Sequence, residues 1–533
     1  MSKQKPDGSG RTPATGYSNN LVSSMKMNLA KNPDMMAIIC EERSATWAEM
    51  WDRTNRLGNG FYSLGLTKGD RVAIYLKNCF EFPETFVATT KSGLIKSPVN
   101  YRLKADEVAY QLNQCGARAV VTDPEYVALL QSVRGKMPDL EHIIVIGNEK
   151  IEGTINYEEL IANSDPGEVP VEILPTDIHM ILYTSGTTGQ PKGAIRGYME
   201  DYHTGMTVCV EWRVRSGDIQ MAVAPLYHAG SCAWFCATLA SGGALVVVPA
   251  FIPEKLLQAI EKYRPNWMMM VPTMYDLLLS LPREILHRYD LSSLRTLISG
   301  GSPLHTPTKH KIIEFFKNAE LNEFYGSTEL GVSTTLRHVD QLRKERCVGK
   351  PLQDLELKLI DPATGNEVKR GEIGLLYSRG LGGLRGYWND PKATEEAFLD
   401  HEWATVGDMA RQDEEGYYYI VDRVKDMIIT GGVNVYPVEI EAALRNNEKI
   451  QDVAVIGVPD EKWGESVKAI VVPKPGVELT EDEIIAYAKE RMAGFKVPKS
   501  VDFVTEIPRS LTGKILKKDL RTKYWGDSQI QVS

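Results

Sequence analysis

Short runs of almost entirely apolar residues recur along this chain, with longer segments of helical spacing between them. The runs are DRVAIYL (70–76), RAVVTD (118–123), HIIVIGN (142–148), ALVVVPA (244–250), NWMMMVP (266–272) and RTLISGG (295–301). Strands that are buried on both faces have this composition, because a helical layer covers each face of their sheet. Segments such as PEKLLQAIEKY (253–263) can supply the crossovers. The pattern predicts an α/β fold with doubly wound, mostly parallel sheets.

The length of 533 residues exceeds what one hydrophobic core holds, which is about 250–300 residues. Three more strand-like runs follow residue 450, separated by helical stretches, and they predict a small, mobile α+β domain. The charged stretch around Asp422 suits an exposed boundary. We therefore predict a disordered tail at 1–20, a large N-terminal domain at 21–422 and a C-terminal domain at 423–533.

The net charge of −9 argues against nucleic acid or an anionic membrane as the main partner, because both call for concentrated basic surface. No stretch of about 18 apolar residues occurs, so we expect no integral membrane association. The seven cysteines are scattered without a C-x-x-C pair, which favours reduced thiols and a cytoplasmic location. Cys232 and Cys236 are predicted to be buried rather than to bind a metal.

The segment YTSGTTGQPKG (183–193) directly follows the apolar pair Ile181-Leu182. Glycines allow close backbone approach, hydroxyl and amide groups donate hydrogen bonds, and one lysine adds charge, so the segment can hold phosphates. Its spacing is neither that of a Walker A loop nor that of the dinucleotide fingerprint. The predicted phosphate-binding residues are Thr184, Ser185, Gly186, Thr187, Thr188, Gly189 and Lys192.

This segment resembles the signature phosphate loop of AMP-forming acyl- and aryl-CoA synthetases. They belong to the adenylate-forming superfamily, which also holds nonribosomal-peptide adenylation domains and luciferases. Four further motifs are similar to that family's motifs, in its order: FYGSTE (324–329), VGD (406–408), DRVKDMIITGGVNVYPVEIE (422–441) and PRSLTGKILK (508–517). The resemblance spans residues 28–523. It implies an enzyme that joins a carboxylic acid to coenzyme A (CoA) with ATP and Mg²⁺, through an acyl-adenylate.

The resemblance also implies roles for residues around the nucleotide. Tyr325 and Gly326, with Gly300, Gly301 and Ser302, would hold the adenine, and Thr328 would contact the α-phosphate. Glu329 and Thr184 would hold Mg²⁺, and hard oxygen ligands suit that ion. Asp408 would accept hydrogen bonds from both ribose hydroxyls, and Arg423 would contact the ribose or phosphates. The family usually has threonine where this chain has Val406, which leaves the support of the Asp408 loop open.

Lys514 matches the family's catalytic lysine. Charge builds on the pentavalent α-phosphorus when the carboxylate attacks, and a positioned ammonium stabilises that state more than the ground state. No general base is needed, because the acid is already ionised at neutral pH.

The second half-reaction passes the acyl group to CoA. The resemblance implies that the small domain rotates about Lys425, which withdraws Lys514 and presents a CoA-binding face. Gly431 and Gly432 would let the pantetheine arm of CoA pass close to the backbone, and Trp463, Phe495 and Lys499 are weaker candidates for contact with CoA. Some family members have an arginine two residues after the aromatic that matches Phe495. This chain has Val497 there, which leaves its contacts to the CoA phosphates open.

His228 matches a family histidine at the wall of the acid pocket, and we expect it to line the pocket rather than to transfer a proton. Arg196 stands where the family usually has serine or threonine, and both a contact to a polar substrate tail and a surface charge are open for it. Transfer to a carrier-protein thiol is an alternative within the superfamily. Phosphoryl transfer, which would release ADP, and nucleotide binding without chemistry are the rivals from other classes. The acid is not named by the sequence, and a homodimer stays open.

Overall fold

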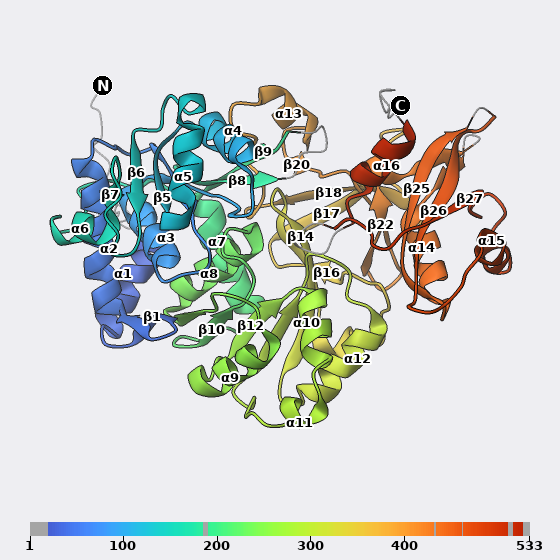
Figure 1. Ribbon diagram of the computed structural model, residues 1–533, viewed down its shortest axis with the longest axis horizontal. Helices are drawn as coiled ribbons and strands as arrows, with labels where there is room; N and C mark the ends of the chain where they lie inside the picture. Colours follow the sequence, from blue (N-terminus) through green and yellow to red (C-terminus); the bar gives the residue numbers. More distant parts are fainter. Residues whose placement is uncertain (1–19, 185–189, 431–432, 461, 510–514, 526–533) are drawn as a thin grey trace, which may run out of the picture.

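The computed structural model describes residues 20–184, 190–430, 433–460, 462–509 and 515–525. The predicted tail at 1–20 therefore lies almost wholly outside the described residues. Figure 1 shows a large body that contains about the first four fifths of the chain, with a smaller lobe formed by about the last hundred residues beside it.

Two sheets of mainly parallel strands form the large body. The first has the order β7 (Ile155–Asn156), β6 (His142–Val145), β5 (Ala117–Thr122), β3 (Arg71–Tyr75), β4 (Ile95–Pro98), β8 (Ile178–Thr184) and β9 (Lys192–Gly197). The second has the order β16 (Lys350–Pro351), β15 (Gly331–Leu336), β14 (Glu320–Ser327), β13 (Thr296–Ser299), β12 (Trp267–Met270), β10 (Ile219–Ala222), β11 (Ala244–Val247), β1 (Met36–Cys40) and β2 (Arg43–Thr46). Each of the six apolar runs forms a strand of one of these sheets, and all six pair in parallel with a neighbour. The predicted α/β class is confirmed.

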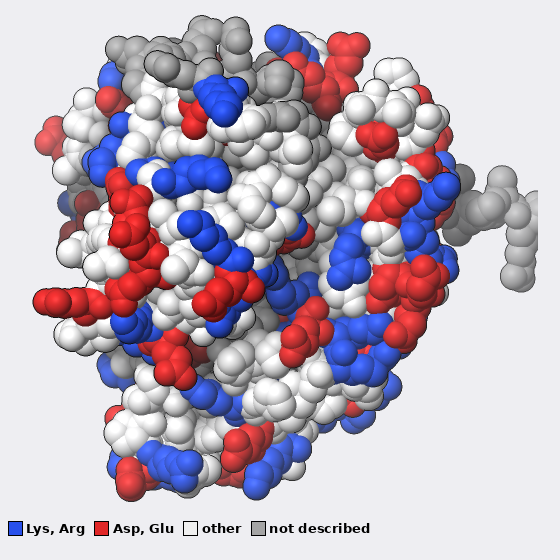
Figure 2. All heavy atoms as spheres, turned by 90° about the vertical axis from the view of Figure 1, so that its right-hand side faces the viewer, with Lys and Arg blue, Asp and Glu red and all other residues white. Residues whose placement is uncertain are grey.

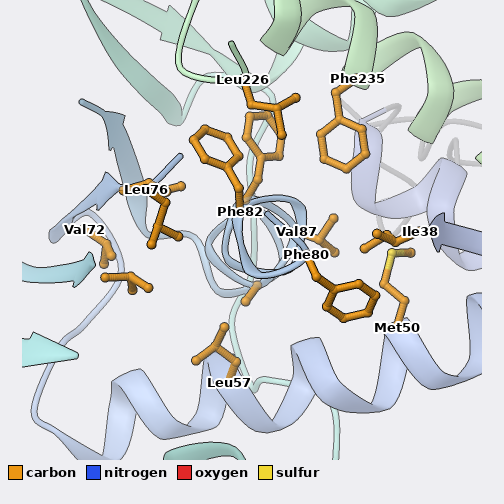
Figure 3. Packing of buried hydrophobic residues seen from close by; sticks show 14 of the residues in the cluster. Ile38, Met50, Leu57, Val72, Leu76, Phe80, Phe82, Val87, Leu226 and Phe235 are labelled. Atoms are coloured by element: carbon orange, nitrogen blue, oxygen red, sulfur yellow. The ribbon is translucent and has the colours of Figure 1, made fainter. Parts of the chain in front are cut away.

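Helices cover and separate the two sheets. They are α1 (Leu21–Lys31), α2 (Trp47–Ser63), α3 (Glu81–Ser92), α4 (Ala105–Cys115), α5 (Pro124–Ser132), α6 (Tyr157–Ala162), α7 (Tyr198–Glu211), α8 (Ala229–Ser241), α9 (Pro253–Tyr263), α10 (Pro272–Leu279), α11 (Arg283–Leu286) and α12 (Thr306–Phe315). Helix α3 is buried along its whole length. Figure 3 views it end-on, with Phe82 and Val87 of the helix among Leu57, Val72 and Leu226 of surrounding elements. One apolar core thus joins both sheets, which fixes the sheet edges that carry the site.

A third sheet was not expected from the sequence. It is antiparallel and contains β17 (Leu355–Ile360), β18 (Ile373–Gly380), β19 (Phe398–Leu399), β20 (Trp403–Ala404), β21 (Asp408–Gln412) and β22 (Tyr418–Arg423), with α13 (Pro391–Glu396) between β18 and β19. Its strand β18 alternates buried and partly exposed residues, the period typical of a sheet with one covered face.

The small lobe has its own sheet and core. Its strands are β23 (Ile428–Thr430), β24 (Val433–Val435), β25 (Ile450–Asp460), β26 (Gly464–Pro473) and β27 (Ser500–Phe503), and its helices are α14 (Pro437–Arg445), α15 (Glu481–Lys489) and α16 (Lys517–Trp525). The three strands expected from the sequence are β25, β26 and β27. This arrangement confirms the predicted small α+β domain.

The surface and the cysteines agree with the composition. On the face that Figure 2 shows, which includes the small lobe, basic and acidic side chains are interspersed. The small lobe contains the ion pairs of Lys468 with Asp502 and of Arg509 with Asp452. Cys232 and Cys236 are buried and unpaired by disulfides, as predicted. Among the described residues, the helices are all too short or too polar to cross a membrane.

Candidate active site

The predicted phosphate-binding segment connects two antiparallel strands. It leaves β8 at its carboxyl end and returns along β9, where Thr184 pairs with Lys192. Ser185, Gly186, Thr187, Thr188 and Gly189 lie outside the described residues. Thr184 and Lys192 are both half-buried. The segment therefore starts at the edge of a parallel sheet where α/β proteins bind ligands.

Neighbouring elements hold this hairpin firmly. The Tyr110 hydroxyl donates to the Pro191 carbonyl oxygen at 3.1 Å, and the Trp388 amide donates to the Gly193 carbonyl oxygen at 2.7 Å. A β-carbon at Gly193 would approach Ile181 to 2.8 Å, so only glycine fits there without displacing its neighbour. The packing explains why a glycine ends the motif.

The second predicted loop also lies in a hairpin. Tyr325 and Gly326 end β14, and Thr328 and Glu329 form the turn into β15; all four are half-buried. Gly300 and Gly301 follow β13, the parallel neighbour of β14, and Ser302 is half-buried beside them. Gly301 has φ +83°, a conformation that favours glycine. The structure thus brings the residues predicted to hold adenine to adjacent strand ends.

Asp408 lies at the centre of a hydrogen-bonded group. The Tyr325 hydroxyl donates to its Oδ2 at 2.5 Å, and Arg423 Nε donates to its Oδ1 at 2.9 Å. Burial, and then the Asp408 charge, raises the pKa of Tyr325 well above its usual range, so the phenol stays a donor. Each carboxylate oxygen has a second lone pair, so Asp408 can still accept from ribose hydroxyls.

Thr405 supplies support for this loop that the sequence left open at Val406. Its hydroxyl donates to the Leu376 carbonyl oxygen at 2.7 Å and accepts from the Gly407 amide at 3.1 Å. A hydroxyl one residue earlier thus fixes the turn before Asp408.

Tyr387 is a site residue that the sequence reasoning missed. Its hydroxyl donates to Glu329 Oε1 at 3.2 Å, and its ring lies 5.3 Å from Lys192 Nζ. It therefore joins the two predicted loops. Burial, and then the charge of Glu329, raises the pKa of Tyr387. The signal was weak, because a lone tyrosine in GYWND has no spacing that marks it as functional.

The residues present fit a magnesium ion that is shared with a nucleotide. Within the described part of the chain, no group of three or more histidine, cysteine or acidic residues could bind a metal by itself. Mg²⁺ on triphosphates typically takes one or two carboxylates and keeps phosphate and water oxygens. Glu329 is a half-buried carboxylate beside the hairpin that carries Thr184, which matches that ligand set.

Replacing Tyr387 by phenylalanine should weaken binding of Mg²⁺-ATP about tenfold. The hydrogen bond to Glu329 is lost, whereas the ring over Lys192 stays, and a bond to a charged group is worth about 1.5–3 kcal/mol. The KM for ATP measures this at several Mg²⁺ concentrations, with Tyr377→Phe on neighbouring β18 as the control. An unchanged KM would contradict the role of Tyr387.

His228 immediately precedes α8 and is half-buried, with its ring 4.3 Å from that of Tyr227. Behind the first turn of α8, the rings of Trp234 and Trp212 lie 5.0 Å apart, and that of Phe324 lies 5.0 Å from Trp234. Phe324 also covers Gly300, where a β-carbon would meet its ring at 2.3 Å. An aromatic wall thus closes the space between α8 and β14.

Arg196 is not a surface charge. It is 3% exposed, and it donates from Nε to Asp201 Oδ1 and from Nη2 to Thr204 Oγ1, both at 3.0 Å, and from Nη1 to the Gly382 carbonyl oxygen. These groups occupy the guanidinium, so Arg196 fixes β9 against α7 rather than meeting a substrate tail. Sequence spacing could not show this, because Gly382 is distant in the chain.

His179 shares Asp201 with Arg196. Its Nδ1 lies 2.7 Å from Asp201 Oδ2 and its Nε2 lies 2.9 Å from Thr90 Oγ1. Burial, and then the charge of Lys96, lowers the pKa of His179 to about 4. The His179 ring is therefore neutral in the folded protein at neutral pH.

The free energy of unfolding should fall between about pH 6.5 and pH 4 because of His179. Its pKa in the folded protein lies below the unfolded value, so its contribution is complete above about 6.5 and is lost as the pH falls toward 4, at up to about 1.4 kcal/mol per pH unit. Urea unfolding at pH 7 and pH 5 measures the difference. The His179→Asn variant should show a smaller difference, and an identical pH dependence would contradict this assignment.

The residues predicted for the second half-reaction lie on the small lobe. Lys425 is half-buried in the connection η3 (Val424–Asp426), and burial lowers its pKa. Trp463 is 47% exposed. Gly431, Gly432 and the catalytic candidate Lys514 lie outside the described residues.

Comparisons with known proteins agree with this geometry. The model of the AMP-binding enzyme family matches residues 25–388, and the model of the AMP-binding enzyme C-terminal domain matches residues 439–514. A feruloyl-CoA synthase of Amycolatopsis sp is 34% identical over 92% of this chain and 96% of its own. A fatty acid–[acyl-carrier-protein] ligase, ScoC of Streptomyces coeruleorubidus, is 30% identical over 96% and 98%.

Solved structures show the same architecture. ATP-bound MatB from Rhodopseudomonas palustris has a TM-score of 0.86 at 31% identity, over 95% of this chain and 99% of its own. Apo MatB, with the same identity and coverage, has a TM-score of 0.76. The anthranilate CoA ligase AuaEII, in complex with anthranoyl-AMP, has a TM-score of 0.84 at 29% identity, over 95% and 97%. The chain therefore belongs to the AMP-binding enzyme family, among the AMP-forming acyl- and aryl-CoA synthetases.

Proposed function

We propose that this protein joins a compact carboxylic acid to CoA in two steps, through an acyl-adenylate bound in the site described above. The observation that carries the proposal is that two contact groups meet on the β14–β15 hairpin, through Tyr325 and Glu329. Tyr325 and Arg423 meet on Asp408, and Tyr387 joins Glu329 to the hairpin of Lys192. The first group suits a nucleoside, and the second suits a metal-bound phosphate chain.

In the first step, the acid's carboxylate attacks the α-phosphorus of ATP and pyrophosphate leaves. Glu329 and Thr184 would hold Mg²⁺, which would neutralise charge on the phosphates. Thr328, at the same turn, would contact the α-phosphate. Lys514 would stabilise the charge that develops as the new bond forms.

In the second step, the CoA thiol attacks the carbonyl carbon of the acyl-adenylate and AMP leaves. Trp463 and Phe495 are 47% and 43% exposed. Such exposure is expected of residues that bind CoA only in the second step. The small domain would rotate about Lys425 to bring that face to the acyl group. The structure has a higher TM-score to ATP-bound MatB than to apo MatB. This difference supports the view that the two domains are arranged here as the first step requires.

The aromatic wall of Trp212, Trp234 and Phe324 supports a compact aryl or alicyclic acid over a long alkyl chain. His228 stands at the entrance to α8 and would line the same pocket. The relatives named for ferulate and anthranilate show that members of the family act on aryl acids, and ScoC shows that others act on fatty acids.

A panel of acids tests the proposal. The purified protein is mixed with ATP, Mg²⁺ and CoA, and with ferulic, benzoic, anthranilic, cyclohexanecarboxylic, hexanoic or palmitic acid; AMP release and thioester formation are followed. We expect AMP and pyrophosphate with an aryl or alicyclic acid. ADP as the nucleotide product would contradict the ligase assignment, and palmitic acid as the best substrate would contradict the compact pocket. Carrier protein bearing phosphopantetheine replaces CoA in a parallel arm, and preference for it would favour the carrier-protein alternative.

A further inference from the structure

The connection between the two domains has a sharply located pivot. On its N-terminal side, the Val424 amide donates to the Gly407 carbonyl oxygen at 2.8 Å. On its C-terminal side, Arg521 of α16 donates to the carbonyl oxygens of Lys425 and Asp426 at 2.6 and 3.0 Å. The backbone between the Val424 amide and the Lys425 carbonyl is therefore the part that can turn while both flanks stay anchored.

One buried carboxylate reaches across this pivot. Asp422 belongs to the large domain, because it lies in β22 and pairs with Met409 of β21. Its Oδ2 accepts a hydrogen bond at 3.0 Å from the amide of Val438, which lies in the first turn of α14 in the small domain. Asp422 is 4% exposed. Tyr436, at the N-cap position of α14, is not a residue type that caps with its side chain, and Asp422 supplies the cap from the other domain.

Burial raises the pKa of Asp422 to about 6, so the carboxylate is ionised at neutral pH, and the charges around this contact favour that form. The amino end of a helix carries partial positive charge, and Val438 lies at that end of α14. Lys517 is buried, with its Nζ 2.9 Å from Glu441 Oε1, and its charge also acts on Asp422. From the large domain, Arg346 Nη2 donates to the Val438 carbonyl oxygen at 3.3 Å, so the same residue is held on both sides.

The arrangement that this contact holds is the one suited to adenylation. The structure is more similar to ATP-bound MatB than to apo MatB, with TM-scores of 0.86 and 0.76. Trp463, a candidate for contact with CoA, is 47% exposed. Both observations support an arrangement for the first half-reaction, in which the CoA-binding face is open to solvent.

We propose that Asp422, Val438 and Lys517 form an interdomain latch that stabilises the adenylating arrangement and must open before thioester formation. Turning about the pivot carries Val438 and Lys517 away from Asp422, because Val438 in α14 and Lys517 in α16 move with the small domain, whereas Asp422 stays in β22. Asp422 is therefore a positioning residue, which acts through the domain arrangement. The inference rests on the proposed two-step function.

The two half-reactions, measured separately, test the latch. The Asp422→Ala variant should form acyl-adenylate about tenfold more slowly, the effect of losing one helix cap of ordinary strength. Conversion of supplied acyl-AMP and CoA should be unchanged or faster, since that step needs the open latch. Asp422→Asn, which keeps an acceptor oxygen but no charge, should fall between Asp422→Ala and the wild type, and it serves if Asp422→Ala does not fold.

Glu441→Gln is the matched control. Glu441 is a buried partner of the same lysine and accepts from the Val455 amide at 2.9 Å, but all of these groups lie in the small domain. Any loss of rate in Glu441→Gln should affect both half-reactions alike. An equal loss of both half-reactions in Asp422→Ala, or no loss, would overturn the latch.

A measurement of domain arrangement, which needs no reaction to occur, tests the latch separately from the proposed function. Distances between a spin label on each domain, measured with ATP present, should spread toward the open arrangement in Asp422→Ala and not in Glu441→Gln. If the wild type forms no acyl-adenylate with any acid, the proposed function fails, and unchanged distances in Asp422→Ala would then overturn the latch independently.

Discussion

Lys514→Ala should lower the rate of acyl-adenylate formation by about 10²–10³, the usual effect of removing one preorganised donor from a developing charge. The attacking carboxylate and the phosphates are both anions. The Lys514 ammonium would therefore stabilise the transition state, in which they meet, more than the ground state. Pyrophosphate release in a single turnover, with the best acid of the panel, measures the rate.

The same variant should convert supplied acyl-AMP and CoA at a rate close to that of the wild type. The adenylate is already formed in that assay, so the charge that Lys514 would stabilise does not arise. Lys518→Ala is the control, because Lys518 is an exposed lysine four residues further along the chain. Loss of both half-reactions in Lys514→Ala would contradict the assigned role.

Gly326→Ala should lower the overall rate by about 10², although all the other residues predicted to bind the nucleotide are unchanged in this variant. A β-carbon at this position would lie 2.1 Å from the Gly331 carbonyl oxygen, directly across the β14–β15 hairpin. The hairpin would have to open, and the turn that carries Thr328 and Glu329 would shift. A displacement of about 1 Å in a positioned group can cost 10² in rate.

Turnover and the melting temperature should be measured together for this variant. Gly135→Ala is the control, because no atom lies within 4 Å of the added β-carbon and φ is ordinary there. A melting temperature that falls only modestly while the rate falls about 10² supports a local effect. A rate within a few-fold of the wild type would show that the hairpin can open at little cost.

The parallel sheets were predictable because their signal is local. A strand covered by helices on both faces must be apolar along its length, and the runs at 118–123 and 266–272 show that directly. The antiparallel third sheet was missed for the opposite reason. Its strand β18 alternates buried and half-buried residues, and so its sequence resembles that of an exposed connection.

The nucleotide residues were predictable only through the order of several motifs, because a lone Asp408 or Arg423 is usually a surface charge. The structure places both against Tyr325 in one hydrogen-bonded group. Tyr387 and Thr405 could not be found in this way. Each acts through a partner that is distant in sequence, Glu329 for Tyr387 and Leu376 for Thr405.

By itself, the sequence determined the α/β class and the family, and it predicted the phosphate-binding segment, because apolar periodicity and glycine spacing are properties of neighbouring residues. Only the tertiary structure decided that Arg196 is a buried support, that Tyr387 joins the two loops, and that Asp422 caps a helix of the other domain. Each of these depends on which distant backbone or side-chain group lies within about 3 Å, and chain spacing carries no record of that distance.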